Sequence, residues 1–310
     1  MASRAGNGGS ASGGSGGTGG SRRRLPPAKP RELEDLLNRR LYHPISRRLA
    51  VLLSYTPVSP NMVSVTGALL VIAAGALYSF AGGAWAIALA FALHLLWHVV
   101  DGADGDLARL TGRASPVGEM VDGACDYLSH ALIYLFLAIH LADWIGWWAY
   151  ALGWAAGLSR VAQASHGESQ RRIYLWRGYG IPWIKQSRAT SDSPASEPSV
   201  LSRLGGAYVW LADRLSPPSP ALDRAAEEAA RDPAARARFT RLCRRTFRTP
   251  LFLQACLGSN PRTLLLALSM ALGSPLWFFL TEVTAMNLLL LASIRRQRTA
   301  NRVLEARLAG

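Results

Sequence analysis

The chain has 310 residues, half of them hydrophobic, and a formal net charge of +14 at pH 7. Its basic residues are almost all arginines that flank apolar segments and are not interleaved with aromatic residues, which excludes a typical nucleic-acid-binding protein and favours a membrane protein. Cys125, Cys243 and Cys256 are widely spaced and form no paired motif, which is compatible with a reduced, cytoplasm-facing site.

Two polar segments precede the first apolar run. Residues 1–30 are rich in Gly and Ser and end in basic residues, so we predict a disordered tail without a cleavable signal peptide. Residues 31–56 carry leucines at helical spacing with arginines on the other faces. This pattern predicts an interfacial amphipathic helix on an anionic leaflet; an ordinary soluble helix is the alternative.

Residues 57–166 contain four hydrophobic runs, each near the roughly 20 residues that a bilayer requires. The segment 250–296 is long enough for two more hydrophobic runs, separated by a turn at either Asn260–Arg262 or Gly273–Pro275. The basic tail 297–310 lies on the cytoplasmic side only if both cross. We therefore predict an all-α membrane protein with six transmembrane helices preceded by the interfacial helix. The four runs are 62–80, 84–100, 117–141 and 144–164.

The connections between these runs predict the orientation. Residues 80–84 and 141–144 contain no Arg or Lys, whereas 107–116 contain two arginines and the stretch after 164 contains three. Positive charge collects on the cytoplasmic side, so we place the N-terminus and the connection after the second run in the cytoplasm of a bacterial-type inner membrane.

Residues 167–249 form a long polar cytoplasmic segment. Ser219 before Pro220 and Asp232 before Pro233 are N-cap and N1 pairs that predict the starts of two short helices. Because they contain little apolar surface, we expect them to lie on the membrane face and not to form a separate core.

Four aspartates interrupt the apolar runs. Asp101 and Asp104 share one helix face and Asp122 and Asp126 share another. Each carboxylate in a membrane helix costs roughly 2.5 to 3.5 kcal/mol, which a bound cation can offset. Hard oxygen ligands without a His or Cys donor favour Mg²⁺ or Mn²⁺ over Zn²⁺. A transporter or cation-binding protein that uses the same acidic cluster is the alternative to an enzyme.

The residues from 101 to 126 read D-x-x-D-G-x-x-A-R, eight residues, then G-x-x-x-D-x-x-x-D. Every fixed position of this pattern matches, and the chain thereby resembles the CDP-alcohol phosphotransferase (CDP-alcohol phosphatidyltransferase) family. The resemblance implies a membrane enzyme of phospholipid or phosphodiester biosynthesis. Such an enzyme transfers a substituted phosphoryl group from a CDP-alcohol, of the CDP-diacylglycerol or CDP-polyol type, to a second alcohol and releases CMP.

The resemblance also implies roles for single residues. The four aspartates would bind two Mg²⁺ or Mn²⁺ ions, and Asp126 would also act as general base. The nucleotide would lie against Asp104 and three small residues, with a weaker case for Asn61. Arg109 either binds nucleotide phosphate or pairs with a neighbouring acid. Relatives are frequently homodimers, so a homodimer is possible, although no sequence feature locates an interface. The small residues are Gly105, Ala108 and Gly118.

Other polar residues near the motif have two interpretations each. Arg160, Arg171 and Arg172 are candidates for binding a phosphate on the acceptor, or they anchor their helix at the anionic leaflet. His94 and His98 are metal ligands or, in the interpretation we favour, polar residues satisfied inside the bundle. Asp106 and Glu119 fall off the two acidic faces and are expected to be solvated.

Overall fold

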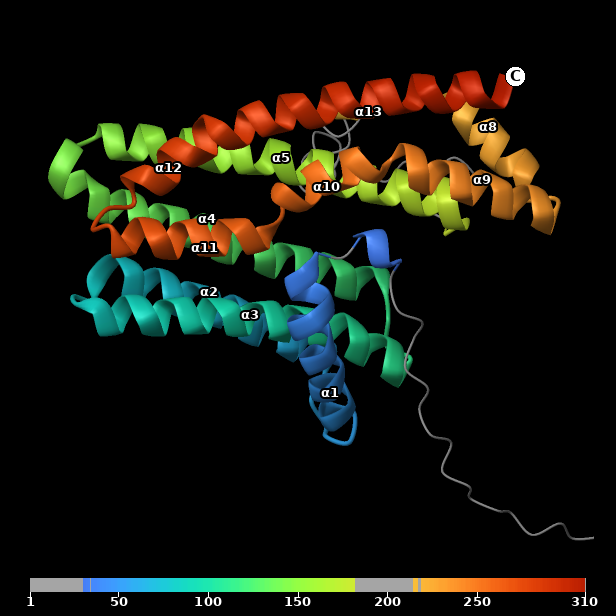
Figure 1. Ribbon diagram of the computed structural model, residues 1–310. Coiled ribbons are helices and arrows are strands. Elements are labelled where there is room, and N and C mark those ends of the chain that lie inside the picture. Colours follow the sequence, from blue (N-terminus) through green and yellow to red (C-terminus); the bar gives the residue numbers. More distant parts are fainter. Residues whose placement is uncertain (1–29, 34, 182–213, 217–218, 310) are drawn as a thin grey trace, which may run out of the picture.

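The computed structural model describes residues 30–33, 35–181, 214–216 and 219–309. The predicted tail lies outside these residues except for Pro30, and so does 182–213, part of the predicted polar segment. Every element in the described residues is helical, which confirms the all-α prediction. Long helices run side by side, and the short helices α8 (Pro220–Ala229) and α9 (Pro233–Thr246) lie at the end of the molecule that carries the C-terminus (Figure 1). The long helices are α2 (Pro60–Phe80), α3 (Ala84–Thr111), α4 (Pro116–Ile145), α5 (Trp148–Tyr179) and α13 (Ala285–Ala309).

Four stretches of the described chain are long and apolar enough to cross a membrane, namely α2, α3, α4 and the α12–α13 stretch 276–308. Helix α5 has 32 residues but mixes apolar with polar positions, and α11 (Ser259–Ala271) has only 13. The structure thus supports an integral membrane protein with four candidate spans. Six spans remain a prediction.

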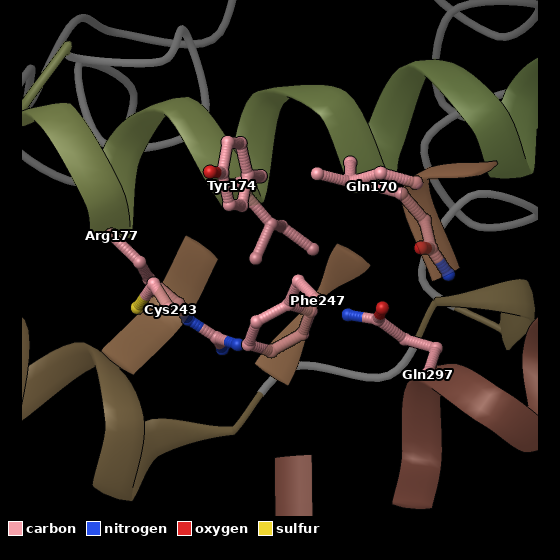
Figure 2. A pocket seen from close by; sticks show the side chains of 8 residues that line it. Gln170, Tyr174, Arg177, Cys243, Phe247 and Gln297 are labelled. Atoms are coloured by element: carbon pink, nitrogen blue, oxygen red, sulfur yellow. The ribbon is translucent and has the colours of Figure 1, made fainter. Parts of the chain in front are cut away.

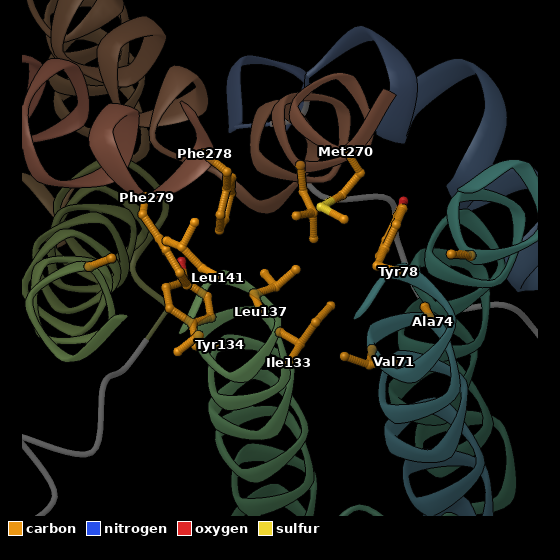
Figure 3. Close-up of a cluster of buried hydrophobic side chains, with 14 of the residues drawn as sticks. Val71, Ala74, Tyr78, Ile133, Tyr134, Leu137, Leu141, Met270, Phe278 and Phe279 are labelled. Carbon is orange, nitrogen blue, oxygen red and sulfur yellow. The ribbon is translucent and has the colours of Figure 1, made fainter. Parts of the chain in front are cut away.

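The centre of the bundle is an apolar core between α2, α4, α11 and α12 (Leu276–Val283). Ile133, Leu137 and Leu141 recur along one face of α4 and are almost fully buried. They meet Val71, Ala74 and Tyr78 of α2 on one side and Phe278 and Phe279 of α12 on the other (Figure 3). This packing fixes α4 between the two halves of the bundle.

Gly75 allows α2 and α4 to approach closely. A Cβ atom at this position would lie 2.7 Å from Cγ1 and 3.2 Å from Cα of Ile133. We expect Gly75→Ala to destabilise the protein by about 1 kcal/mol or more, because the two helices would have to separate. Thermal unfolding in detergent measures this, with Gly82→Ala as control because its Cβ would meet nothing within 4 Å. Equal melting temperatures for the two variants would contradict the close approach.

The N-terminal helix crosses the bundle. After the 3-10 turn η1 (Arg31–Leu33), the π-helix η2 (Asn38–Tyr42) continues into α1 (His43–Leu53), which packs on α3. The Ser46 hydroxyl donates a hydrogen bond of 2.7 Å to the Val99 carbonyl. It lies close to Gly102, where a Cβ atom would collide with it. Leu41 and Leu52 remain exposed on the outer side. That face suits the predicted interfacial position, which stays a prediction.

Two acidic residues fasten this N-terminal segment to the rest of the chain. Glu32 accepts hydrogen bonds from the hydroxyls of Tyr174 (2.8 Å) and Tyr179, and Asp35 accepts one from Asn260 (2.7 Å). Burial acts to raise the pKa of Glu32, but the hydrogen bonds from the two tyrosines outweigh it, so the pKa lies below its usual value. The segment is therefore held as a charged, hydrogen-bonded bridge across the bundle.

The short polar helices share a small core with α5 and α13, which was not expected, whereas their position on the membrane face stays a prediction. Helices α8 (Pro220–Ala229) and α9 (Pro233–Thr246) begin at the predicted caps Ser219 and Asp232. The missing apolar partners come from α5 and α13, which project beyond the bundle. The predicted tail 297–310 continues α13 as helix to Ala309. The core contains Tyr174, Leu222, Phe239, Phe247 and Leu304.

A small pocket lies within this second core, lined by residues of α5, α9, α13 and α10 (Arg248–Cys256), with Gln170, Arg177 and Gln297 as its polar members (Figure 2). Arg177 is almost fully buried and is held by Asp223 at 2.7 Å. The pocket is thus separate from the aspartates of α3 and α4.

Of the two candidate turns between the last two predicted spans, the structure has its turn at Gly273–Pro275. Gly273 has a φ of +89° and separates α11 from α12, whereas Asn260–Arg262 lies at the start of α11. Arg262 is buried and pairs with buried Glu282 of α12 at 2.8 Å, and it also donates to the Gly258 carbonyl. Removing one partner of such a buried pair typically costs about 3 to 5 kcal/mol, because the other charge is left buried and unpaired.

Candidate functional site

The two acidic faces lie on neighbouring helices joined by a short turn. Helix α3 ends at Gly112, which takes the left-handed conformation (φ +68°) that favours glycine. Helix α4 begins after Ser115, whose side chain accepts a hydrogen bond from the Gly118 amide, with Pro116 in the first turn. Every fixed position of the motif therefore lies in a helix, and its aspartates lie toward the same end of the bundle.

Asp104 and Asp122 lie side by side across α3 and α4. Asp104 is buried, accepts a hydrogen bond of 2.6 Å from the Ser64 hydroxyl of α2, and interacts directly with the Asp122 carboxyl group. Ser64 thus holds one of two like-charged groups in place. Two carboxylates so close repel each other strongly in a medium of low dielectric constant.

Asp126 lies one turn further along α4, within range of the charge of Asp122 and of Arg160 on α5. The Trp97 indole lies beside the Asp126 carboxylate. The backbone carbonyl of Asp126 is 2.8 Å from Nδ1 of His130. Arg160 is therefore close to the predicted base.

The carboxylates suit a hard divalent cation by their chemistry, although they are not arranged as a finished coordination shell. Among the residues that the structure describes, no three His, Cys, Asp or Glu side chains converge on one point as metal ligands. The carboxylates instead adjoin in pairs, Asp104 with Asp122 and Asp122 with Asp126. A cation between such neighbours would offset their repulsion, and carboxylate oxygens are ligands that Mg²⁺ and Mn²⁺ prefer. Asp101 is half-buried on the same helix as Asp104.

The residues predicted to contact the nucleotide lie on three helices. A Cβ at Gly118 would lie 3.7 Å from Oδ1 of Asn61, which brings the start of α2 to the start of α4. A Cβ at Gly105 would lie 3.4 Å from the guanidinium of Arg109, so the glycine leaves room beside that charge. Ala108 is half-buried on the same helix. Small residues thus expose backbone where a flat ligand could approach.

Arg109 pairs with Asp106 at 2.7 Å, and the Arg109 side chain remains 46% exposed. Asp106 is buried, so the expectation that it is solvated is wrong; its partner one turn away stabilises the buried charge. The structure therefore shows Arg109 paired with a neighbouring acid. Because part of its side chain remains exposed, the binding of nucleotide phosphate by Arg109 stays a prediction.

The two histidines before the motif lie inside the bundle. Nε2 of His98 is 3.0 Å from the Thr263 hydroxyl of α11, and the His98 ring stacks on Tyr42 at 5.0 Å between centroids. His94 is buried, and its Nδ1 has no hydrogen-bond partner in the described chain. His98 is thus satisfied by protein contacts, whereas His94 is satisfied only in part.

The three candidate arginines do not form one group. Arg171 and Arg172 both pair with Glu168, Arg171 through two hydrogen bonds of 2.8 Å. Arg160 precedes them by eleven residues on one continuous helix, or about 16 Å along its axis. A single small phosphate cannot reach all three, and Arg160 is the one beside Asp126.

Sequence reasoning missed several residues around the aspartates, namely Trp97, His130, Tyr134 and Thr263. Their positions depend on how α3, α4 and α11 pack, which no local pattern reveals. Ser64 had a weak signal, a hydroxyl one turn after Asn61 in a largely apolar run.

Comparison with known proteins agrees with the motif. Residues 57–174 match the family model described as CDP-alcohol phosphatidyltransferase, which includes α2, α3, α4 and most of α5. No curated protein matches the chain. The matched region contains all four motif aspartates and Arg160, whereas the helices from α8 onward lie outside it. Residues 57–174 are therefore similar to the CDP-alcohol phosphatidyltransferase family, which transfers a phosphate-linked group from a CDP-alcohol.

Proposed function

We propose that the protein transfers a substituted phosphoryl group from a CDP-alcohol to the hydroxyl of a second alcohol and releases CMP. The observation that carries this proposal is the row of neighbouring carboxylates, Asp104, Asp122 and Asp126, across α3 and α4 within the family match. Like charges gathered in a membrane helix bundle are costly unless they serve a ligand.

Asp101, Asp104, Asp122 and Asp126 would hold two Mg²⁺ or Mn²⁺ ions. When bound, such ions neutralise diphosphate oxygens and so lower the barrier to attack by a nucleophile. Asp104 is kept in place by Ser64, and Asp122 lies between Asp104 and Asp126. The donor's diphosphate would then bind to the ions that these side chains hold.

Asp126 acts as the general base. The acceptor oxygen forms a bond to the β-phosphorus, the bond from that phosphorus to the CMP oxygen breaks, and its electron pair leaves with CMP. The hydroxyl proton passes to the Asp126 carboxylate. The cytidine moiety would lie against Gly105, Ala108 and Gly118, with Asn61 and Arg109 at its edges.

Arg160 recognises a phosphate group on the acceptor. Its guanidinium has no carboxylate within ion-pair distance in the described chain, although it lies in the bundle next to the base. A cation so placed suits an anionic ligand group. Arg171 and Arg172 already share Glu168, which fits a role in anchoring α5 near the anionic leaflet.

We expect Arg160→Gln to raise the KM for a phosphorylated acceptor about 10-fold, equivalent to about 1.4 kcal/mol, and to leave the KM for the CDP-alcohol unchanged. Arg172→Gln is the matched control and should change either KM less than twofold, since Arg172 is already paired. Steady-state kinetics with glycerol 3-phosphate and inositol 1-phosphate measure both values. Equal losses with phosphorylated and unphosphorylated acceptors would remove the phosphate role of Arg160.

Sealed membrane vesicles test the reaction and the cytoplasmic orientation together. A membrane-impermeant CDP-alcohol such as CDP-glycerol, added outside with an acceptor and Mg²⁺, should yield CMP from inside-out vesicles and none from right-side-out vesicles. Chelation of divalent ions by EDTA should stop CMP release. Release in the presence of EDTA would exclude the metal-dependent mechanism, and release only from right-side-out vesicles would place the site on the outer face.

A further inference from the structure

The proposed base has a hydrogen-bond partner that the mechanism above does not use. Trp97 lies on α3, one turn before Asp101, and is only 3% exposed. Its indole N–H donates a hydrogen bond to the carboxylate of Asp126 on α4. The two helices that carry the motif are thus joined at the base by a residue that the motif does not contain.

The Trp97 indole is held on several sides. The ring centroids of His98, His130 and His94 lie 4.5, 4.7 and 5.6 Å from the indole centroid. A Cβ at Gly67 of α2 would lie 3.4 Å from Cδ1 and 3.9 Å from Nε1 of Trp97, so the backbone of α2 packs against the edge that carries the N–H. Close packing of this kind keeps a large, rigid side chain in one rotamer.

The Asp126 carboxylate has no such restraint of its own. An aspartate carboxyl group turns easily about its last side-chain bond, because the preferred angles of that bond are broad. His130 contacts only the backbone carbonyl of Asp126, and Arg160 acts on the carboxylate through its charge, which sets no plane. A hydrogen bond from a fixed ring is directional, so Trp97 can fix the orientation of the carboxylate.

The chemistry of the indole limits what Trp97 can do. A buried indole N–H needs an acceptor in any protein, and here the acceptor is the carboxylate that the proposed reaction requires. The indole donates a hydrogen bond but accepts none, so Trp97 cannot replace Asp126 as base. A carboxylate has about four acceptor positions, so this one bond leaves others free for a proton and a cation.

We propose that Trp97 is a positioning residue for Asp126, which holds the carboxylate so that its free oxygen faces the hydroxyl of the acceptor. This inference rests on the proposed function and adds a residue to it. A general base works only within hydrogen-bond reach of the proton that it takes, and a small displacement of the reacting groups lowers the rate. Trp97 therefore acts through Asp126 and needs no contact with either substrate.

Two substitutions of Trp97 test the proposal. Nε2 of an imidazole is as many bonds from the backbone as Nε1 of an indole, so Trp97→His keeps an N–H donor, whereas Trp97→Phe keeps only an aromatic ring. We expect Trp97→Phe to lower kcat about 30-fold and Trp97→His only about 3-fold, with the KM for both substrates within twofold. CMP release is measured at saturating Mg²⁺ with the best pair among CDP-diacylglycerol or CDP-glycerol and glycerol 3-phosphate or inositol 1-phosphate.

A role of Trp97 in packing alone predicts the opposite order. Burying an imidazole in an apolar core costs more free energy than burying a phenyl ring, so Trp97→His should be the less stable variant. Melting temperatures in detergent give the order of stability. Trp154→Phe is the control for the change of ring, because Trp154 is 73% exposed on α5, and its kcat should stay within twofold of the parent.

The hydrogen bond itself can be observed without turnover. In protein labelled with ¹⁵N at the indole nitrogens, the N–H signal of Trp97 is identified by its absence from Trp97→Phe. This signal should move upfield in Asp126→Ala, because the N–H loses its acceptor, and the signal of Trp154 should not move. An unchanged Trp97 signal would show that no hydrogen bond joins the two residues and would overturn the proposal.

The outcomes separate this proposal from the one on which it rests. If the parent protein releases no CMP from any of these substrates, the proposed function fails, and the positioning role fails with it. If the parent releases CMP and Trp97→Phe is as fast as Trp97→His or faster, the role of Trp97 is refuted while the transferase activity stands.

Discussion

Asp126→Asn is expected to lower the rate of CMP release by about 1,000-fold or more, because asparagine cannot accept the proton of the attacking hydroxyl near neutral pH. The substitution keeps the size of the side chain and its neighbours Trp97 and His130. Folding should therefore be preserved, and the loss should lie in kcat. A steady-state assay on membranes with matched amounts of protein measures it.

Asp143→Asn is the control for this substitution. Asp143 lies near the other end of α4 and is exposed, so the same change in charge should leave turnover within twofold of the parent. If Asp126→Asn retained more than a tenth of the parent rate, Asp126 would not be the base, and another group near the acceptor oxygen would have to take the proton.

Asp104→Asn is expected to lower CMP release by about 100-fold or more, because it removes a proposed metal ligand from the buried pair with Asp122. Ser64→Ala should act more mildly. Without the 2.6 Å hydrogen bond that holds Asp104, the Mg²⁺ concentration for half-maximal activity should rise about 10-fold, and added Mg²⁺ should restore the rate.

Ser79→Ala tests whether the loss of any buried hydroxyl from α2 has the same effect, since the Ser79 hydroxyl is also buried and has no partner in the described chain. It should leave the Mg²⁺ requirement unchanged. A Ser64→Ala protein with an ordinary Mg²⁺ requirement, or an Asp104→Asn protein with near-normal turnover, would contradict the assignment of Asp104 to a metal site.

Local patterns predicted much of the fold and the acidic part of the site. The spacing of the four aspartates placed them on two helix faces, and the structure brings Asp104, Asp122 and Asp126 together at one end of the bundle. The cap pairs at Ser219 and Asp232 correctly predicted the starts of α8 and α9. These features depend on residues within one or two helical turns, which sequence reasoning can address.

Features that depend on distant partners could not be predicted. Asp106 looked solvated because its helix position gave no hint of its burial, and only the structure shows the arginine that pairs with it. The second core was missed because α8 and α9 gain their apolar contacts from α5 and α13, far away in the sequence.

The measurement that tests the account most directly is the product balance of the purified protein in lipid vesicles. The donor, CDP-diacylglycerol or CDP-glycerol, carries a labelled β-phosphate and is supplied with an acceptor and Mg²⁺. The amounts of CMP and of labelled phosphodiester are then measured in the same sample. We predict one phosphodiester for each CMP, with both products lost after chelation or in the Asp126→Asn protein. Passage of the intact nucleotide or of a divalent cation across the vesicle membrane, with the donor's phosphate bond unbroken, would contradict the account and indicate a transporter.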